Sequence, residues 1–432
     1  MRRIIIISLL AITASCAIAQ QQALPTAREE IRKSPCLSAS NYLAYPGPQQ
    51  QQLTPAPEGY TPCYISHYGR HGSRFLIDTM DYVRPMRVLM RADSAGVLTA
   101  TGRDALHRIQ RMYAESYRRW GELTQLGAEQ HRDIARRMME RFPEVFRGSV
   151  VVDARSTVVI RCILSMTNEL LQLQSMNPGL RITHDASFAD MYYMNLRDRK
   201  IEQLRQDTKR REYCDQWELT HFHPERFMGV LFTNKDFLPE QHQQNRLYHD
   251  IFQLASAVQN SEIRREMTLY DLFTNDELYE NWQRDNIYWF MGYGNSRLTQ
   301  NAIPFSQRNL LRNIILTADS CLQRPVPGAT LRFGHESMVL PLTCLMELNG
   351  FGQAIDDVET LEQQGWVNYR VFPMGANIQL VFYRKKDAPV LVKVLLNENE
   401  AQLPIHSDEA PYYKWEDVRT YYLNKLNHYE EP

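Results

Sequence analysis

The sequence contains few of the residues that are typical of fibrous proteins, low-complexity proteins or proteins with a structural zinc site. Its 432 residues contain 19 glycines, 21 prolines and 7 cysteines. So little glycine and proline excludes a fibrous or low-complexity chain. No two cysteines are spaced as CxxC, and this argues against a structural zinc site or a thioredoxin-like motif.

An excess of charge of one sign is also lacking. The formal net charge is −1, so nothing in the overall charge favours binding to nucleic acid or to an anionic membrane. Hydrophobic residues make up 44% and charged residues 23%, which is ordinary for a globular protein that buries a sizeable core. A chain of this length predicts two or three domains, or one large core with an insertion.

Long hydrophobic runs are scarce. Residues 4–12 form an apolar run that only Ser8 interrupts, and it is too short to span a bilayer, which takes about 20 residues. Arg2-Arg3 precedes this run and Ala17-Ile18-Ala19 follows it, so the pattern predicts a signal peptide over residues 1–19. We therefore expect an exported protein, periplasmic or secreted, with no transmembrane segment.

The cysteines leave two questions open. Cys16 could be lipidated, as in lipoprotein signals, but Thr13 stands where such signals usually carry Leu, and a soluble form is favoured over a lipid anchor. Removal of residues 1–19 leaves six others, namely Cys36, Cys63, Cys162, Cys214, Cys321 and Cys344. They either pair as disulfides, with a connectivity that sequence cannot choose, or stay as buried free thiols that pack like small hydrophobes.

The order of predicted elements indicates an α/β fold. Residues 20–61 read as an irregular lead-in, 63–68 as a strand, 80–147 as helices and 149–154 as a strand before a long helix. After a helical stretch, strand and helix patterns resume. We predict a mixed central β-sheet flanked by helices, with a mostly α-helical inserted subdomain. The boundaries are 1–19 for the signal peptide, 20–184 for the first part of the core, 185–304 for the insertion and 305–432 for the second part of the core.

The motif that carries chemistry is YGRHGSRF, directly after the first strand. Arg70 and Arg74 flank His71 in a loop that Gly69 and Gly72 allow to bend sharply. A guanidinium matches phosphate oxygens bidentately, and a neutral imidazole held beside that phosphate can attack phosphorus to give a phosphohistidine. The alternative is a basic surface loop.

This segment resembles the signature RHGxRxP of the histidine acid phosphatases, the branch of the histidine phosphatase superfamily that includes phytases and multiple inositol polyphosphate phosphatases. Leu76 occupies the place of the final proline, a departure that affects rigidity more than chemistry. GELTQLGAEQ is similar to the family's LTxxGxxQ helix start, and ARSTVVIR to its second arginine segment. The resemblance implies that Arg161 binds the substrate phosphate and that Arg155 supports it from behind.

The family's distal motif is a histidine followed by an acid, and TLRFGHESMVLPL is similar to it. The resemblance implies that His335 binds the phosphate and that Glu336 is the general acid. Many members carry His-Asp, whereas the inositol polyphosphate phosphatases typically carry His-Ala-Glu, and Ser337 stands where their Glu would be. The subfamily, and with it the substrate, stays open on sequence grounds.

Three other patterns are weaker candidates. His184-Asp185 is a literal His-Asp pair, but no helix that would cover a core sheet follows it. HFHPE (221–225) could suggest a metal site, yet Pro224 breaks any regular display of its two imidazoles. The aromatic run NIYWFMGYG (286–294) is read most simply as core.

Taken together, the residues and the resemblance predict an exported acid phosphatase that works without a metal ion or cofactor and forms a phosphohistidine. Its expected partner is a small phosphomonoester rather than nucleic acid, and an inositol polyphosphate such as phytate is favoured. A broad-specificity acid phosphatase acting on sugar or nucleotide phosphates is the alternative. From other classes, a non-catalytic phosphate-ester binding protein or a mutase-like transferase remains possible. The sequence does not give the oligomeric state.

Overall fold

A computed structural model describes residues 25–431 of the chain. The predicted signal peptide, residues 1–19, and Cys16 within it lie outside the described residues. The described part is built on one 8-stranded sheet with the order β3-β2-β4-β1-β5-β6-β7, and β8 pairs with β6. The strands are β1 (Thr61–Arg70), β2 (Val151–Ser156), β3 (Arg181–Asp185), β4 (Gly328–Gly334), β5 (Asn377–Arg384), β6 (Leu391–Leu396), β7 (Asn399–Glu400) and β8 (Tyr413–Lys414).

The sheet is half parallel and half antiparallel. β3, β2, β4 and β1 are paired in parallel, whereas β5, β6, β7 and β8 join by antiparallel pairing. Because β4 lies between β1 and β2, three neighbouring parallel strands end at the same edge of the sheet. That edge receives the segments that carry the YGRHGSRF, ARSTVVIR and FGHE motifs.

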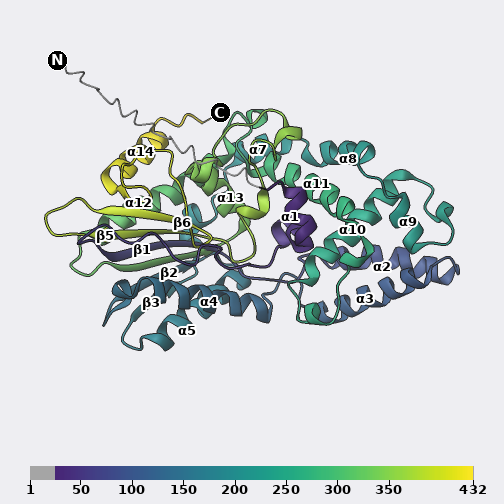
Figure 1. The fold of residues 1–432 in the computed structure, drawn as a ribbon, viewed down its shortest axis with the longest axis horizontal. Coiled ribbons are helices and arrows are strands. Elements are labelled where there is room, and N and C mark those ends of the chain that lie inside the picture. The colour runs from purple at the N-terminus through teal and green to yellow at the C-terminus, as the bar shows by residue number, and fades with distance from the viewer. Residues whose placement is uncertain (1–24, 432) are drawn as a thin grey trace, which may run out of the picture.

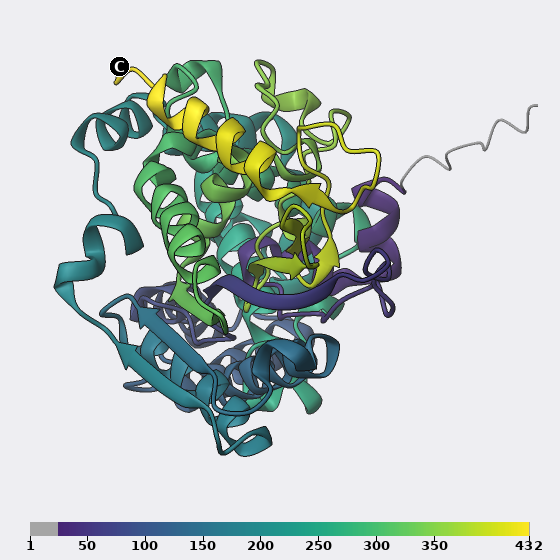
Figure 2. The ribbon, with the colours of Figure 1, turned by 90° about the vertical axis from the view of Figure 1, so that its left-hand side faces the viewer.

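Helices cover both faces of the sheet, as Figures 1 and 2 show. One face packs on α4 (Gln125–Arg141) and α5 (Ile160–Met176), which share an apolar core with the strands that includes Ile134, Met138 and Phe333. Ile134 and Met138 are two of the helically spaced apolar positions in the sequence. The other face carries α12 (Arg308–Leu322), α13 (Glu336–Leu345) and α14 (Trp415–Asn427).

A second, all-helical part lies beside one end of the sheet (Figure 1). Its elements are α1 (Ala27–Lys33), α2 (Thr79–Ser94), α3 (Ala100–Ser116), α8 (Arg210–His221), α9 (Glu225–Leu231), α10 (Gln241–Val258) and α11 (Asn275–Tyr293). The short helix α6 (Met191–Met194) packs instead on α12, and α7 (Arg199–Asp207) follows it in the chain. α2 packs on α10, and α3 packs on α9. The helical part therefore draws on residues 79–116 as well as on the stretch after residue 185. The division of the chain at residues 184 and 304 stays a prediction.

The lead-in before β1 is more ordered than its composition suggests. The sequence predicted an irregular segment, but residues 27–33 form α1 and Pro35–Tyr42 a 3-10 helix. Thr26 and Glu29 form a reciprocal capping box at the start of α1, which satisfies backbone donors that a short helix otherwise leaves free. Burial of Ala27 and Ile31 attaches the segment to the rest of the protein.

The cysteines of the described part are all free thiols. Cys162, Cys214, Cys321 and Cys344 are buried, and Cys36 and Cys63 are half-buried. Of the two possibilities that the sequence left open, the structure has the unpaired one, with the buried thiols packed as small apolar groups.

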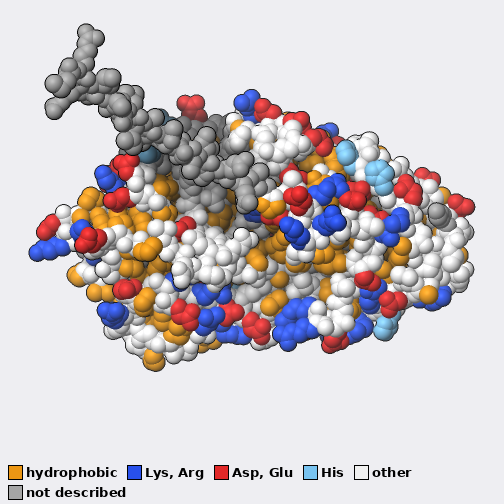
Figure 3. All heavy atoms as spheres, viewed as in Figure 1, with side chains coloured by type: hydrophobic (Ala, Val, Ile, Leu, Met, Phe, Trp, Pro, Cys, Tyr) orange, Lys and Arg blue, Asp and Glu red, His pale blue; other side chains and the backbone are white. Residues whose placement is uncertain are grey.

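The described residues agree with the predicted class, an α/β fold with a mixed sheet flanked by helices. Among them, no helix combines the length and the apolar character that a bilayer crossing requires. On the face seen in Figure 3, Lys and Arg side chains are interspersed with Asp and Glu, in line with the net charge of −1.

Candidate active site

The candidate site lies at the carboxyl ends of β1, β4 and β2. Arg70 is the last residue of β1 and His71 follows it, while His335 follows β4. Arg161 lies in the first turn of α5, the helix that comes after β2. Open α/β sheets typically bind ligands at this edge of their parallel strands. The fold thus joins three segments that are far apart in sequence.

The backbone at the nucleophile is fixed by neighbouring strands. The His71 N–H donates to the Gly334 carbonyl over 2.9 Å, and the Gly375 N–H donates to the His71 carbonyl over 2.9 Å. The His71 ring has Nδ1 2.9 Å from the Gly72 carbonyl. Because a carbonyl only accepts, Nδ1 carries the hydrogen and Nε2 keeps its lone pair in the neutral ring. Nε2 is therefore the ring nitrogen with a free lone pair, and it is buried without a hydrogen-bond partner.

The glycines at this loop permit close packing. A Cβ on Gly72 would lie 2.4 Å from the Gly127 carbonyl oxygen, and a Cβ on Gly127 would lie 2.3 Å from the Ser73 carbonyl oxygen. Neither Gly69 nor Gly72 has a positive φ, so the bend that the sequence ascribed to them does not use a left-handed backbone. Gly72 is required because the loop touches the first turn of α4.

Three arginines surround the nucleophile, and each is partly anchored. Arg70 Nη1 donates to the carbonyls of Asn41 (2.8 Å) and Phe372 (2.6 Å). Arg74 donates to the Phe75 carbonyl over 2.9 Å, and its guanidinium lies 5.3 Å from the ring centre of Tyr42.

Several guanidinium N–H donors around His71 are buried and have no hydrogen-bond partner within the described part of the chain. Among the described residues, the hydrogen bond of the Arg161 side chain is to the Gly121 carbonyl, at 3.5 Å. Buried donor atoms without a hydrogen-bond partner include Nη2 of Arg70 and Nε of Arg74 and Arg161. Buried polar groups normally find partners, so unsatisfied donors of three guanidiniums around one lone pair indicate an anion-binding position.

Glu336 occupies this position in the structure. Its Oε2 lies 3.1 Å from Arg70 Nε and 3.5 Å from His71 Nε2. His335 stands on the other side of the nucleophile, with its ring centre 5.8 Å from that of His71 and its Nε2 3.2 Å from Thr157 Oγ1. The Glu336 carboxylate thus stands in for the negative charge of a substrate.

The environment shifts the pKa values of the three titratable groups. Burial, and then the neighbouring Arg70 and Arg161, hold the pKa of His71 well below its usual value, although Glu336 opposes this. Burial and the same arginines lower the pKa of His335 to about 4. Burial alone would raise the pKa of Glu336, but Arg70 and His71 outweigh it and hold that pKa well below its ordinary value. In the free site His71 is therefore neutral, as a nucleophile requires, and Glu336 is ionised.

These residues fit a phosphate better than a metal ion. One ligand atom from each of His71, His335 and Glu336 lies within 4.8 Å of the others, which is a spacing that a cation could use. However, the guanidiniums of Arg70 and Arg161 act electrostatically on the same groups, and they repel a cation as they attract an oxyanion.

Arg155 is the one sequence-predicted site residue that lies apart. Its Nη1 is 2.9 Å from Asp153 Oδ1 and its Nε is 3.7 Å from Asp190. Both carboxylates lie toward the β3 edge of the sheet, so Arg155 is engaged there rather than behind Arg161. Sequence spacing alone could not show this, because successive residues around the end of a strand point to different faces.

The weaker candidates do not join the site. His184 and Asp185 lie at the end of β3, an exposed edge strand. In HFHPE, the His221 ring stacks on Trp217 with ring centres 4.2 Å apart, whereas His223 lies 3.5 Å from Glu280. The two imidazoles thus have different partners and form no common metal site with Glu225.

A cavity of about 840 Å³ lies in the helical part, lined by residues of α2, α8, α10 and α11 and by Asn41, Tyr42 and Ile77. Asn41 and Tyr42, which contact Arg70 and Arg74, line its inner end. Tyr288 and Trp289 also line it, so part of the aromatic run that the sequence assigned to the core faces this space. Its charged lining comprises Arg84, Arg211, Arg246 and Arg284 together with Asp81, Asp215, Glu218, Asp250 and Asp285.

Two of the four cavity arginines are paired with acids. Arg84 donates to Asp250 over 2.9 Å, and Arg284 lies 2.9 Å from Glu218 and 3.3 Å from Asp285. Arg211 and Arg246 have no ion pair among the described residues. The cavity is therefore lined both by arginines without such an ion pair and by arginines whose charge is neutralised by acids.

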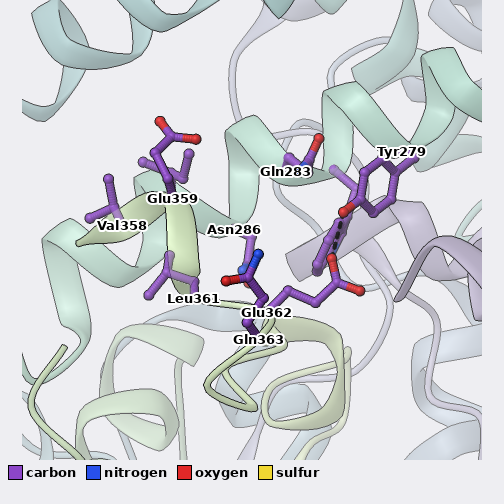
Figure 4. Close-up of a pocket in the computed structure, with 10 residues that line it drawn as sticks. Tyr279, Gln283, Asn286, Val358, Glu359, Leu361, Glu362 and Gln363 are labelled. Atoms are coloured by element: carbon purple, nitrogen blue, oxygen red, sulfur yellow. Dashed lines mark hydrogen bonds between the residues drawn. The ribbon is translucent and has the colours of Figure 1, made fainter. Parts of the chain in front are cut away.

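A smaller cavity of about 60 Å³ lies on another side of α11 (Figure 4). It is lined by Tyr279, Asn286, Glu359 and Glu362 among others, and Tyr279 donates to Glu362 over 2.5 Å. No arginine, lysine or histidine of the described residues lines it. Its lining therefore offers a phosphate group no cationic side chain.

A layer of polar residues that the sequence did not reveal lies beneath residues 70–74, which we call the nucleophile loop after the proposed role of His71. His67, His131 and Glu169 are fully buried there. One signal was available, since Arg161, Ser165 and Glu169 recur every four residues and must share one face of a helix. The structure places that face of α5 under the loop, where Ser165 accepts a hydrogen bond from the Gly72 N–H.

Comparisons with known proteins agree with this geometry. A family profile described as histidine phosphatase superfamily (branch 2) matches residues 70–397, and this confirms the resemblance drawn from the sequence. A solved multiple inositol polyphosphate phosphatase from Bifidobacterium longum, in complex with inositol hexasulfate, is similar to the chain with a TM-score of 0.76 at 17% identity, over 88% of this chain and 96% of that one.

A phytase from D. castellii is similar with a TM-score of 0.68 at 12% identity, over 92% of this chain and 86% of that one. No curated protein sequence matches the chain. At these identities the structural neighbours establish a shared fold.

Proposed function

We propose that this chain, which belongs to the histidine phosphatase superfamily (branch 2), hydrolyses phosphomonoesters through a covalent phosphohistidine on His71. The observation that carries the proposal is the free lone pair of His71 Nε2 among three guanidiniums with unused donors. In phosphoryl transfer the protein mainly positions the groups and stabilises charge on the three equatorial oxygens. In our proposal Arg70, Arg74, Arg161 and His335 hold these oxygens without a divalent ion.

In the first step, His71 Nε2 attacks phosphorus and the bond to the leaving oxygen breaks. Glu336 has to leave its place near Nε2 for the phosphate to enter. Once a phosphate dianion occupies Arg70, the adjacent like charge raises the pKa of the Glu336 carboxyl. The carboxyl then takes up a proton from solvent and passes it to the departing alkoxide. The products are an alcohol, a phosphorylated His71 and an ionised Glu336.

In the second step, water attacks the phosphohistidine. Glu336, now ionised, accepts a proton from that water as a general base. The Nε2–phosphorus bond breaks, inorganic phosphate leaves, and the neutral imidazole of His71 is restored. The low pKa of His71 serves both steps, because the ring stays unprotonated and nucleophilic in acid during the first and is a better leaving group during the second.

For the substrate we favour an inositol polyphosphate. A cavity of about 840 Å³ has the size of a typical small-molecule site, and Arg211 and Arg246 can contact additional phosphate groups. The five cavity carboxylates favour a second candidate, a broad-specificity acid phosphatase acting on sugar or nucleotide phosphates, because they disfavour dense negative charge in the leaving group. We further propose that the chain is exported after removal of residues 1–19.

The decisive experiment combines trapping with a substrate panel. Rapid alkaline quench during turnover of a ³²P-labelled monoester should leave label on His71, because the P–N bond of a phosphohistidine is labile in acid and persists in base. His71→Ala should abolish both the label and turnover while phosphate binding remains measurable. Full activity in this variant would sink the proposal. Phosphate release from phytate, sugar phosphates and nucleotides then separates the two substrate candidates.

A further inference from the structure

The peptide bond between Arg70 and His71 is held from both sides. Its N–H donates to the Gly334 carbonyl over 2.9 Å, and its carbonyl lies 3.2 Å from His131 Nε2. His131, on α4, is fully buried. The plane of this peptide sets the position of the His71 Cα, so both contacts bear on where the nucleophile stands.

Hydrogen-bond accounting fixes a proton at His131. The Arg70 carbonyl can only accept, so His131 Nε2 must carry a hydrogen. The other ring nitrogen, Nδ1, lies 2.9 Å from Glu169 Oε2, and that bond needs one more proton, on the nitrogen or on the carboxyl. With this proton the pair has no net charge, which is the arrangement that tolerates complete burial.

His67 is not a second close partner for Glu169. It is fully buried, its Nε2 lies 4.0 Å from the other oxygen of Glu169, and neither of its ring nitrogens has a hydrogen-bond partner. Burial lowers its pKa to about 4, so it stays neutral. Glu169 therefore has one close partner, and that partner is His131.

The same helix faces hold the rest of the loop. The Gly72 N–H donates to Ser165 Oγ over 3.1 Å, and the Ser73 N–H donates to Gln130 Oε1 over 2.8 Å. Ser165 and Glu169 are one turn apart on α5, and Gln130 and His131 are adjacent on α4. Three consecutive peptide units are thus fixed from below by side chains of two helices.

We propose that His131 and Glu169 are positioning residues for the phosphoryl-transfer step, acting through the Arg70 carbonyl to hold His71 Nε2 in line with the substrate. The inference rests on the proposed function, since it concerns the same nucleophile. A displacement of about 1 Å at a reacting atom can cost on the order of a hundredfold in rate, so a contact that fixes the nucleophile's backbone acts on catalysis without touching the substrate.

The test compares Glu169→Ala with Glu169→Gln. A glutamine amide can donate to His131 Nδ1 and leave Nε2 on the Arg70 carbonyl, so we expect it to retain kcat within about threefold. Alanine leaves Nδ1 without a partner, and we expect kcat and the rate of phosphohistidine formation to fall about tenfold or more. Inhibition by inorganic phosphate should change little, because Arg74 and Arg161 are held by other contacts.

Leu173→Ala is the matched control. Leu173 lies one turn further along α5, is fully buried and contacts only the core beneath the sheet. It should lower thermal stability and leave kcat unchanged. Should Glu169→Ala not fold, His131→Gln and His131→Leu give the same comparison, because only glutamine can donate to the Arg70 carbonyl.

Three results would overturn the inference: wild-type kcat in folded Glu169→Ala, an equal loss in Leu173→Ala, or Glu169→Gln as impaired as the alanine variant. If the wild-type protein forms no phosphohistidine, the proposed function fails instead.

Discussion

The state of Glu336 in the free site differs from the one that the proposed reaction requires. The carboxylate is bound to Arg70 at 3.1 Å and held ionised, yet the proposed reaction needs it protonated beside the leaving group. Glu336→Gln keeps the volume and hydrogen bonding of the side chain but removes the proton. General acid catalysis contributes about 10²–10⁴-fold, so with an inositol or sugar phosphate kcat should fall by that order.

A comparison of leaving groups shows whether this loss of kcat comes from missing general acid catalysis. Nitrophenol departs without protonation, so the same variant should lose much less activity on nitrophenyl phosphate. The measurement is the ratio of kcat values for the two substrates in wild type and variant. Equal losses on both substrates would show that Glu336 has a structural role and that another group supplies the proton.

Residue identities were predictable here, and side-chain conformations were not. The motifs placed Arg70, His71, Arg74, Arg161, His335 and Glu336 together, and the structure gathers all six. The engagement of Arg155 with Asp153 and the position of Glu336 on Arg70 depend on packing between segments. His131 and Glu169 form no motif, because their roles arise only when α4 and α5 meet under the loop.

At the scale of elements, the nucleophile loop and α4 are in close contact through Gly72 and Gly127. Gly127→Ala would place a methyl group 2.3 Å from the Ser73 carbonyl oxygen, so either the helix or the loop must move. We expect a loss of stability of roughly 1–3 kcal/mol, as in overpacked cores, and a decrease in kcat. Thermal unfolding and steady-state kinetics measure the two effects.

Gly179→Ala is the control for this prediction. A Cβ at Gly179 would meet its nearest atom, an Asn177 side-chain oxygen, at 3.2 Å, and the site is distant in the chain from the loop. Both properties should stay close to wild type. Wild-type kinetics in Gly127→Ala would mean that the tight contact has no bearing on the nucleophile.

The departure from the family motif at Leu76 also has an account at this scale. The Leu76 N–H donates to the Tyr82 hydroxyl over 3.1 Å, a bond that proline at this position could not make. Tyr82 belongs to α2, so the hydrogen bond ties the end of the motif to the helical part. The sequence showed that the proline is missing, but it could not show the hydrogen bond to Tyr82 that leucine permits.

For the molecule as a whole, the cavity acids predict how stability depends on pH. Burial, partly offset by Arg84, raises the pKa of Asp250 from 3.8 to about 6. The folded state thus keeps this proton to a higher pH than the unfolded state, and the resulting stabilisation, present in acid, is lost as pH rises from about 4 through 6. A shift of this size corresponds to at most roughly 3 kcal/mol.

Asp250→Asn removes that dependence. Between pH 4.5 and 7.5 the melting temperature of the wild type should fall relative to that of the variant, as followed by calorimetry. Asp276→Asn is the control, since Asp276 is largely exposed, and its curve should run parallel to the wild type. Parallel curves for Asp250→Asn as well would contradict the prediction.

Metal removal is a further test on the intact protein. The proposed phosphate ligands are three cationic side chains and a neutral imidazole, so substrate charge is balanced without a divalent ion. Activity should survive dialysis against excess chelator. Loss of activity that zinc or magnesium restores would assign a cation to the cluster of His71, His335 and Glu336.

The order of strands in the sheet has a consequence for biosynthesis. β1, which carries the nucleophile, has β4 and β5 as its neighbours, and both are made more than two hundred residues later. A growing chain therefore holds its reactive histidine for most of translation without the partners that shape it. If His71, His335 and Glu336 act as we propose, no fragment that ends before Gly334 can hydrolyse a phosphate ester, and a chain threaded through a membrane before folding would begin to act only on the far side.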